Sequence, residues 1–130
     1  MTEIEARGLP ACLTEAFTIA TDGCDAVFLS VDIDVVDPGS APGTGTPEPG
    51  GLSSRQLLDA VRRATIELPV AGIDVVEVSP PYDHAEVTAY LANRVVLEAL
   101  SGIAWRRRAA TGDVPRRPEN PLLEGRRPPH

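Results

Sequence analysis

The sequence has little of the residue types that several classes of protein require. Its only histidines are His84 and His130, and no His/Cys cluster at ligand spacing supports a zinc site. Aromatic residues make up 4% of the chain, too few to form a stacking platform. The two cysteines, Cys12 and Cys24, do not constitute a disulfide scaffold, and we expect both to be buried, reduced thiols.

Long apolar segments are also missing. No run approaches the roughly 20 residues that a membrane-spanning helix needs. No basic and apolar leader opens the chain, so we expect a cytoplasmic protein without a membrane partner. With 42% apolar and 24% charged residues, the 130-residue chain has the composition of one globular domain.

Lysine is absent, and the 12 cationic residues, all arginine, are unevenly distributed. Residues 106–130 have a net charge of +4, whereas residues 1–105 have a net charge of -11. An acidic body argues against nucleic-acid binding, because phosphate contacts need a basic face. We expect residues 1–105 to form the folded part and residues 106–130 to be a disordered Arg- and Pro-rich tail.

Hydrophobic periodicity predicts alternating helices and strands. Helical spacing recurs over residues 9–20, 53–68 and 83–103, and the apolar runs at 27–33 and 70–78 are typical of parallel strands covered on both faces. Ser53 with Gln56 is expected to form a capping box, and Asp83 with Glu86 to cap the last helix. The predicted fold class is therefore α/β with a parallel sheet.

Acidic residues lie at the C-terminal ends of both predicted strands. Asp32 and Asp34 end the first strand, and their spacing predicts that both side chains point the same way at the sheet's carboxyl edge. Two close carboxylates favour a bound Mg²⁺ or Mn²⁺, and a solvated acidic turn explains the pattern equally well. Glu77 ends the second strand, where it could hold a metal or a guanidinium, or simply be exposed. A right-handed crossover would bring it to the aspartate pair.

The stretch between these acidic residues is a long Gly- and Pro-rich loop, residues 37–51, with the sequence DPGSAPGTGTPEPGG. Loops of this length in compact domains are usually functional. No Gly-Lys-Ser/Thr follows it, so it is not a phosphate loop, and Glu48 replaces the third glycine of a dinucleotide fingerprint.

Two stretches together resemble a signature of the ureohydrolases, the family that includes arginase, agmatinase and related guanidino-acid hydrolases. They are SVDIDVVDP at 30–38 followed by APGTGTPEPGG at 41–51, and GIDVVEVSPPYD at 72–83. The second stretch is similar to the agmatinase side of the family. The resemblance covers residues 2–105 and implies a three-layer α/β/α fold, of which this chain would form a part.

The resemblance also implies a chemistry. Family members use two Mn²⁺ ions bridged by a hydroxide, which attacks the guanidinium carbon of a substrate such as agmatine and releases urea and an amine. By position, Asp32 resembles the aspartate that bridges the metals, and Asp34 a ligand of one of them. Glu77 resembles the carboxylate that binds the guanidinium, and Thr46 lies in the loop near the substrate.

The departures from the family pattern are equally informative. The family's upstream Gly-Gly-Asp-His and Asp-Ala-His-x-Asp stretches are absent, as is its proton-shuttling histidine. The chain therefore resembles the C-terminal portion of an agmatinase-like enzyme, as a truncated product or one with a misplaced start. Half of the metal site is lacking, so whether the chain is itself an enzyme stays open, and we expect the isolated chain to be inactive.

Two other functions are compatible with the residues. The chain could be a non-catalytic subunit that docks through its exposed sheet edge onto another ureohydrolase chain. An Mn²⁺-dependent glycosyltransferase also uses Asp-x-Asp, although no other feature supports that class. Because a two-stranded sheet leaves apolar edges, we expect weak stability, self-association or a homo-oligomer.

Overall fold

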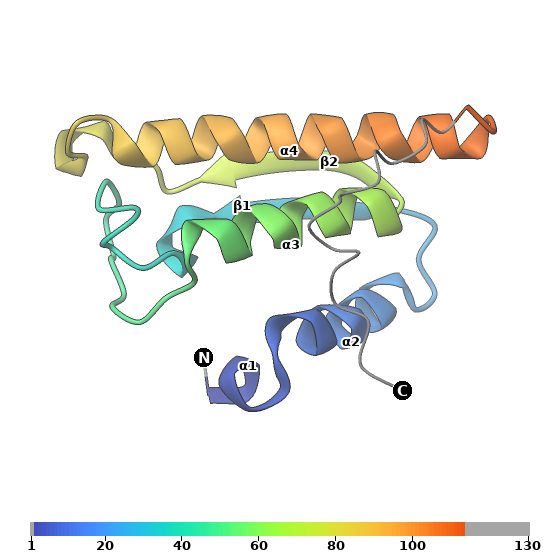
Figure 1. Ribbon diagram of the computed structural model, residues 1–130, viewed down its shortest axis with the longest axis horizontal. Coiled ribbons are helices and arrows are strands. Elements are labelled where there is room, and N and C mark those ends of the chain that lie inside the picture. Colours follow the sequence, from blue (N-terminus) through green and yellow to red (C-terminus); the bar gives the residue numbers. More distant parts are fainter. Residues whose placement is uncertain (1, 114–130) are drawn as a thin grey trace, which may run out of the picture.

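The structure is a computed structural model that describes residues 2–113, and it places helices against a two-stranded parallel sheet (Figure 1). The elements in chain order are α1 (Thr2–Arg7), α2 (Leu9–Thr21), β1 (Val27–Asp32), the 3₁₀ helix η1 (Ile33–Val35), α3 (Ser54–Glu67), β2 (Val70–Val76), the 3₁₀ helix η2 (Pro80–Tyr82) and α4 (Val87–Ala110). The predicted α/β class and its order of helices and strands are confirmed, with α1 as an unpredicted addition.

The two strands run parallel, with Val27 opposite Val70 and Asp32 opposite Val76. Both end slightly before the predicted boundaries. At Ile33 the chain turns into η1, and at Glu77 the backbone takes a left-handed conformation with φ of 65°. Either change breaks the alternation that a ladder requires, so the strands stop at the end that carries the acidic residues.

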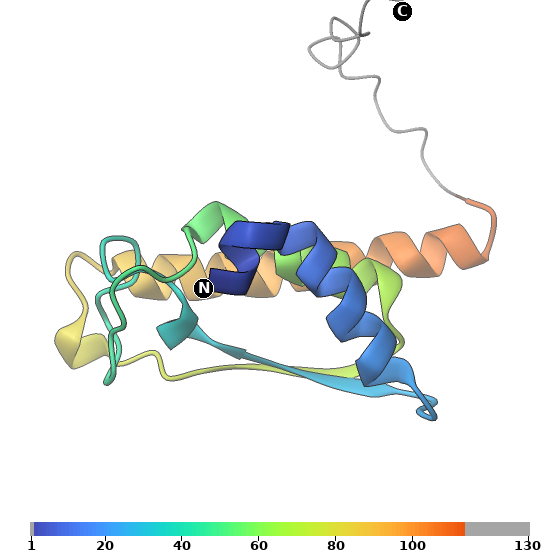
Figure 2. The ribbon, with the colours of Figure 1, turned by 90° about the horizontal axis from the view of Figure 1, so that it is seen from below.

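The helices cover one face of the sheet. Figure 2 shows α2, α3 and α4 on the same side of β1 and β2. On the opposite face, Phe28 is 65% exposed, and Ser30 and Asp32 are exposed as well. The prediction that both strand faces are covered is wrong for residues 2–113, because none of their helices lies on that face. The expected three layers are represented in this part of the chain by two.

The core lies between α3, α4 and the inner face of the sheet. On α3 and α4 its buried members recur at the three- and four-residue spacing of an amphipathic helix, and the full set is Val31, Ile33, Val36, Ala41, Leu57, Leu58, Val61, Leu91, Val95 and Ala99. Glu98 of α4 joins the two helices, since its carboxylate lies 3.3 Å from Arg62 of α3 and 2.6 Å from Arg94. Gly102 lets α4 approach Thr65 closely, because a Cβ there would collide with the Thr65 hydroxyl.

The two predicted caps differ in outcome. At α3 the capping box is present: the Gln56 N–H donates to Ser53 Oγ at 3.2 Å, and the Ser53 N–H donates to Gln56 Oε1 at 2.8 Å. At α4, Asp83 accepts the backbone N–H groups of Thr88 and Ala89, both at 3.0 Å. Glu86 does not cap, because it takes a left-handed conformation and its side chain makes no capping bond.

Helix α4 continues to Ala110, so the prediction of disorder from residue 106 is wrong for residues 106–110. Arginine and alanine are strong helix formers, and Arg107 and Arg108 place positive charge at the helix C-terminus, where it is favourable. The rest of the predicted tail, residues 114–130, lies outside the described residues, as does His130.

The two cysteines are less buried than the sequence predicts. Cys12 and Cys24 are both free, but Cys12 is half-buried and Cys24 is exposed, so the expected burial is wrong. Cys24 lies in the turn between α2 and β1, which no other element covers in the described part of the chain. Among residues 2–113, no helix is both long and apolar enough to cross a membrane.

Candidate functional site

Asp32 and Asp34 come from two different elements. Asp32 is the last residue of β1 and the N-cap of η1, and its Oδ1 accepts the Asp34 N–H at 2.9 Å. Asp34 lies within η1, so the expectation that both aspartates belong to the end of one strand is wrong. A 3₁₀ turn repeats every three residues, so the alternation of side chains along a strand does not continue from Asp32 to Asp34.

The carboxylate of Asp34 is held by the Gly/Pro-rich loop. The hydroxyls of Thr44 and Thr46 each donate to one of its two oxygens. Thr44 is 3% exposed, whereas Thr46 is exposed. The sequence analysis singled out Thr46 but missed Thr44, although the Gly-Thr-Gly-Thr repeat places the two threonines two residues apart. The loop thus orients a predicted metal ligand.

The loop is closed at its base by Asp37. This carboxylate accepts the N–H of Gly39 at 2.8 Å and that of Gly50 at 2.9 Å, and these backbone bonds lower the pKa of Asp37. The Asp37 N–H donates to the Leu52 carbonyl at 2.9 Å, and the Leu52 N–H donates to the Val35 carbonyl at 2.8 Å, which forms a short bridge beside it. These contacts tie both ends of residues 37–51 together, so the loop has a defined path.

The loop is also attached to the segment that follows β2. The Gly43 carbonyl accepts the Ser79 N–H at 2.8 Å, and the Gly43 N–H donates to Thr88 Oγ1 at 2.8 Å. A Cβ on Gly43 would lie 2.5 Å from the Cβ of Asp83, so only glycine fits this approach. Burial raises the pKa of Asp83, but backbone N–H groups at the start of α4 outweigh burial and lower the pKa overall.

Glu77 lies at the same end of the sheet as the two aspartates. It directly follows Val76, the register partner of Asp32, and adjacent strands are about 4.8 Å apart. Its side chain is exposed, and its φ of 65° is uncommon for a residue with a Cβ. Backbone outliers of this kind cluster at functional sites. The structure therefore brings Asp32, Asp34 and Glu77 to the same end of the sheet, where both strands stop.

These side chains fit part of a cation site. Carboxylate and hydroxyl oxygens suit a hard divalent cation such as Mn²⁺ or Mg²⁺. Within residues 2–113, no three His, Cys, Asp or Glu side chains lie close enough together to hold a metal ion. Among these residues, the Asp32 and Asp34 carboxylates are therefore an incomplete ligand set for a metal ion.

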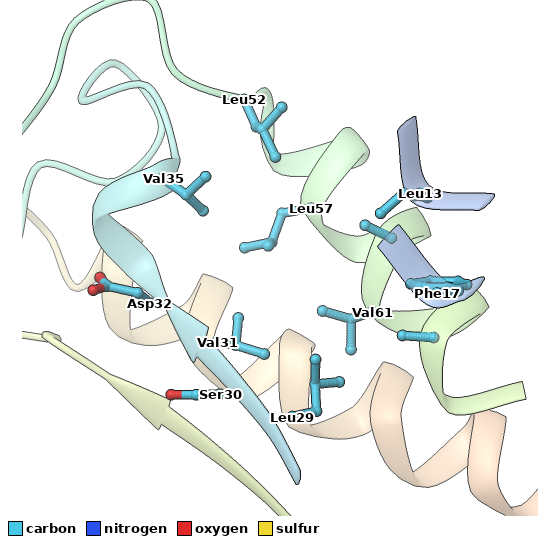
Figure 3. Close-up of a pocket in the computed structure, with 12 residues that line it drawn as sticks. Leu13, Phe17, Leu29, Ser30, Val31, Asp32, Val35, Leu52, Leu57 and Val61 are labelled. Carbon is cyan, nitrogen blue, oxygen red and sulfur yellow. The ribbon is translucent and has the colours of Figure 1, made fainter. Parts of the chain in front are cut away.

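An apolar cavity lies next to Asp32, between α2, β1 and α3. Its volume is about 330 Å³, and its walls include Leu13, Phe17, Leu57 and Val61. Figure 3 shows the Asp32 carboxylate pointing away from these apolar side chains. Apart from Ser30 and Asp32, the residues that line the cavity are apolar, so the candidate chemistry stays at the acidic end of the sheet.

Comparison with known proteins identifies the family. The model of the arginase family matches residues 1–102, and the chain belongs to that family. The chain is 57% identical over 74 residues to proclavaminate amidinohydrolase of Streptomyces clavuligerus, covering 57% of this chain and 23% of that enzyme. It is 49% identical over 77 residues to agmatinase of Bacillus subtilis, covering 58% of this chain and 27% of that enzyme.

A solved structure agrees with the sequence comparison. The crystal structure of formimidoylglutamase from Bacillus subtilis superposes with a TM-score of 0.73 at 40% identity, covering 77% of this chain and 31% of that one. The arginase-like fold of this portion is thereby confirmed. The chain spans about a quarter to a third of the length of these relatives.

Proposed function

We propose that this chain carries one part of the active site of an agmatinase-like ureohydrolase. The completed site hydrolyses a guanidino compound such as agmatine to urea and an amine. The observation that carries the proposal is the register of the sheet, in which Asp32 lies opposite Val76 and Glu77 follows directly. The names of the similar enzymes, agmatinase and proclavaminate amidinohydrolase, support a guanidino or amidino substrate.

Asp32 and Asp34 are the residues of this chain that would hold Mn²⁺. When bound, the metal lowers the pKa of a water molecule and neutralises negative charge that develops in the transition state. One oxygen of Asp32 orients the Asp34 backbone, which leaves its other oxygen available. The Thr44 and Thr46 hydroxyls hold Asp34 in one orientation. A ligand held in place beforehand loses less entropy when the cation binds.

Glu77 is the residue that would recognise the substrate. A carboxylate can accept two parallel N–H bonds from a guanidinium, which fixes the plane and position of the reacting carbon. The exposed Glu77 side chain, at the same sheet edge as the aspartates, is accessible to such a group. Thr46 lies across the edge on the loop, where it can line the substrate's path.

The first test measures Mn²⁺ binding and urea release by the purified chain. We expect weak Mn²⁺ binding, at least tenfold weaker in Asp32→Asn and Asp34→Asn, and no measurable urea from agmatine. Glu77→Gln should retain Mn²⁺ binding. Asp74→Asn is the matched control, because Asp74 is an exposed carboxylate on the same sheet but lies mid-strand. Urea release at an enzymatic rate would disprove inactivity of the isolated chain.

Mn²⁺ binding by the aspartate variants tests which residues are the metal ligands. If Asp32→Asn and Asp34→Asn bind Mn²⁺ as tightly as the unmodified chain, the two aspartates are not the ligands and the proposed site is wrong. Equal weakening in Asp74→Asn would show that binding reflects general negative charge rather than the strand-end pair.

A further inference from the structure

The buried hydroxyl of Thr88 joins the start of α4 to the Gly/Pro-rich loop. Thr88 is 0% exposed, and its Oγ1 accepts the Gly43 N–H at 2.8 Å. Figure 1 and Figure 2 both show the loop beside the segment that leads into α4. The two residues are 45 positions apart, so this bond is a tertiary contact and not part of a local turn. Because Gly43 is itself buried, the bond satisfies a backbone donor that water does not reach.

The hydrogen bonding of Thr88 differs from that of threonines in the other helices. Thr14, Thr18 and Thr65 each donate their hydroxyl to the carbonyl four residues earlier in their own helix, at 2.9 to 3.0 Å. Thr88 is the second residue of α4, and the residue four positions before it, His84, precedes the helix. Its hydroxyl oxygen accepts a bond from a distant segment, which fixes the loop relative to the helix.

Asp83 holds Thr88 in place from just before the helix. Its Oδ1 accepts the N–H groups of His84 at 2.9 Å and of Thr88 at 3.0 Å, and its Oδ2 accepts the Ala89 N–H at 3.0 Å. The first N–H groups of a helix have no partner within the helix, so a carboxylate at this position binds them strongly. Bonds to both oxygens fix the carboxylate against the first turn of α4, and the Thr88 hydroxyl is fixed with it.

Gly43 transmits this constraint to the candidate site. Thr44 follows it in the chain, is buried, and donates its hydroxyl to Asp34. The Gly43 carbonyl accepts the Ser79 N–H at 2.8 Å, and Ser79 lies two residues after Glu77. A displacement of Gly43 would therefore move the hydroxyl that holds Asp34 and loosen the segment that carries Glu77.

We propose that Thr88 is a positioning residue for Asp34 and acts through Gly43 and Thr44 from the start of α4. This inference rests on the proposed function, in which Asp34 is a ligand of Mn²⁺. A residue that hydrogen-bonds to a metal ligand sets the orientation of that ligand, and its loss weakens metal binding. Thr88 lies one step further out, since it holds the backbone beside the supporting Thr44 hydroxyl.

A role of Thr88 in packing alone predicts different behaviour. Valine has nearly the shape of threonine but cannot accept a hydrogen bond, so Thr88→Val keeps the packing and leaves the Gly43 N–H without its acceptor. Thr88→Ser keeps the hydroxyl and loses a buried methyl group. If Thr88 served packing alone, serine would be the more harmful replacement, whereas a positioning role makes valine the more harmful one.

The first measurement is amide hydrogen exchange of the full chain without metal, followed by NMR. The exchange rate of the Gly43 amide is divided by that of Val95, which is 0% exposed and reports opening of the core. This ratio should rise at least tenfold in Thr88→Val and stay within threefold in Thr88→Ser. Thr65→Val is the matched control, because Thr65 is equally buried but bonds to Val61 of its own helix, and it should leave the ratio unchanged.

The second measurement is the affinity for Mn²⁺, taken from the electron paramagnetic resonance signal of the free ion. Thr88→Val and Thr44→Val should each bind Mn²⁺ at least fivefold more weakly, whereas Thr88→Ser and Thr65→Val should stay within twofold of the unmodified chain. The double variant of Thr44→Val and Thr88→Val should be less than twofold weaker than Thr44→Val, because both changes remove the same support. Should valine at position 88 prevent folding, Thr88→Ala is compared with Thr88→Ser, from which it differs only by the hydroxyl.

Several outcomes would overturn the positioning role of Thr88. They are an unchanged exchange ratio in Thr88→Val, serine as harmful as valine, and losses of Mn²⁺ affinity that multiply in the double variant. Faster Gly43 exchange with unchanged Mn²⁺ binding would also overturn it. Asp34→Asn separates this failure from failure of the proposed function. If Asp34→Asn weakens Mn²⁺ binding and Thr88→Val does not, only the role of Thr88 is wrong, and if neither does, the proposed function is wrong as well.

Discussion

Asp34 depends on two threonines that differ in burial, and this difference predicts different consequences of losing each hydroxyl. Thr44, which donates to one Asp34 oxygen, is 3% exposed, whereas Thr46, which donates to the other, is exposed. Thr44→Val should lower the free energy of unfolding by about 1.5–3 kcal/mol, the usual worth of a hydrogen bond to a charged group. Urea denaturation followed by circular dichroism measures this change.

Thr46→Val is the control for this prediction. Water can replace the Thr46 hydroxyl at the exposed Asp34 oxygen, so the expected loss is below about 1 kcal/mol. Equal losses for both variants would mean that burial does not distinguish the two bonds.

Because the pKa values of Asp37 and Asp83 are lowered in the folded chain, we expect the protein to lose stability in acid. Backbone N–H groups hold the pKa of each carboxyl below its ordinary value, in Asp83 against the opposing effect of burial. A carboxyl with a lowered folded-state pKa stabilises the fold above its unfolded pKa, about 3.9 for aspartate, and this contribution is lost as pH falls through the folded pKa. The free energy of unfolding should therefore decrease below about pH 4.

Chemical denaturation between pH 3 and pH 6 checks the acid prediction, with Asp37→Asn and Asp83→Asn alongside. Each variant should be less stable at pH 6 and should show a flatter dependence on pH, because one titrating group has been removed. A slope unchanged in both variants would assign the acid sensitivity to other carboxyls.

At the scale of elements, the contact between α3 and α4 depends on Gly102. Thr65 is fully buried, and its hydroxyl is already bonded to the Val61 carbonyl at 2.9 Å, so it cannot move away from an added methyl group. Gly102→Ala gains up to about 1 kcal/mol in helix propensity but incurs an overpacking cost of about 1–3 kcal/mol. We expect a net loss of stability and a lower Tm by differential scanning calorimetry.

Ser101→Ala is the matched change for this prediction. Ser101 is exposed on the same helix one residue earlier, and its hydroxyl donates to the Leu97 carbonyl of its own helix. Its replacement should alter stability by less than about 0.5 kcal/mol. A Gly102→Ala variant as stable as Ser101→Ala would show that the helices can separate enough to admit a methyl group.

At the scale of the whole molecule, the chain alone should be weakly stable or should self-associate. Within residues 2–113 the outer edges of β1 and β2 have no paired strand, apolar cavities lie beside both strands, and Phe28 is 65% exposed. Sedimentation velocity at several concentrations should show oligomers that increase with concentration, together with a broad thermal transition. A monomer with a sharp, concentration-independent transition would contradict this prediction.

The sequence by itself determined the α/β class, the order of the main elements and the capping box at Ser53, because periodicity and local hydrogen bonding act over a few residues. It also identified the family through the strand-end acidic stretches. Only the tertiary structure decided the placement of Asp34 in a 3₁₀ turn after β1, the Thr44 bond and the attachment of Gly43 to the start of α4. These depend on a 3₁₀ turn and on contacts between residues up to 45 positions apart.

The uncovered face of the sheet was also decided by the tertiary structure. The apolar pattern of a strand is the same whether one or both of its faces are covered in the folded protein. Only the arrangement in space shows that α2, α3 and α4 all lie on one side, leaving Phe28 exposed. Burial is a property of the folded structure and not of the strand's own residues.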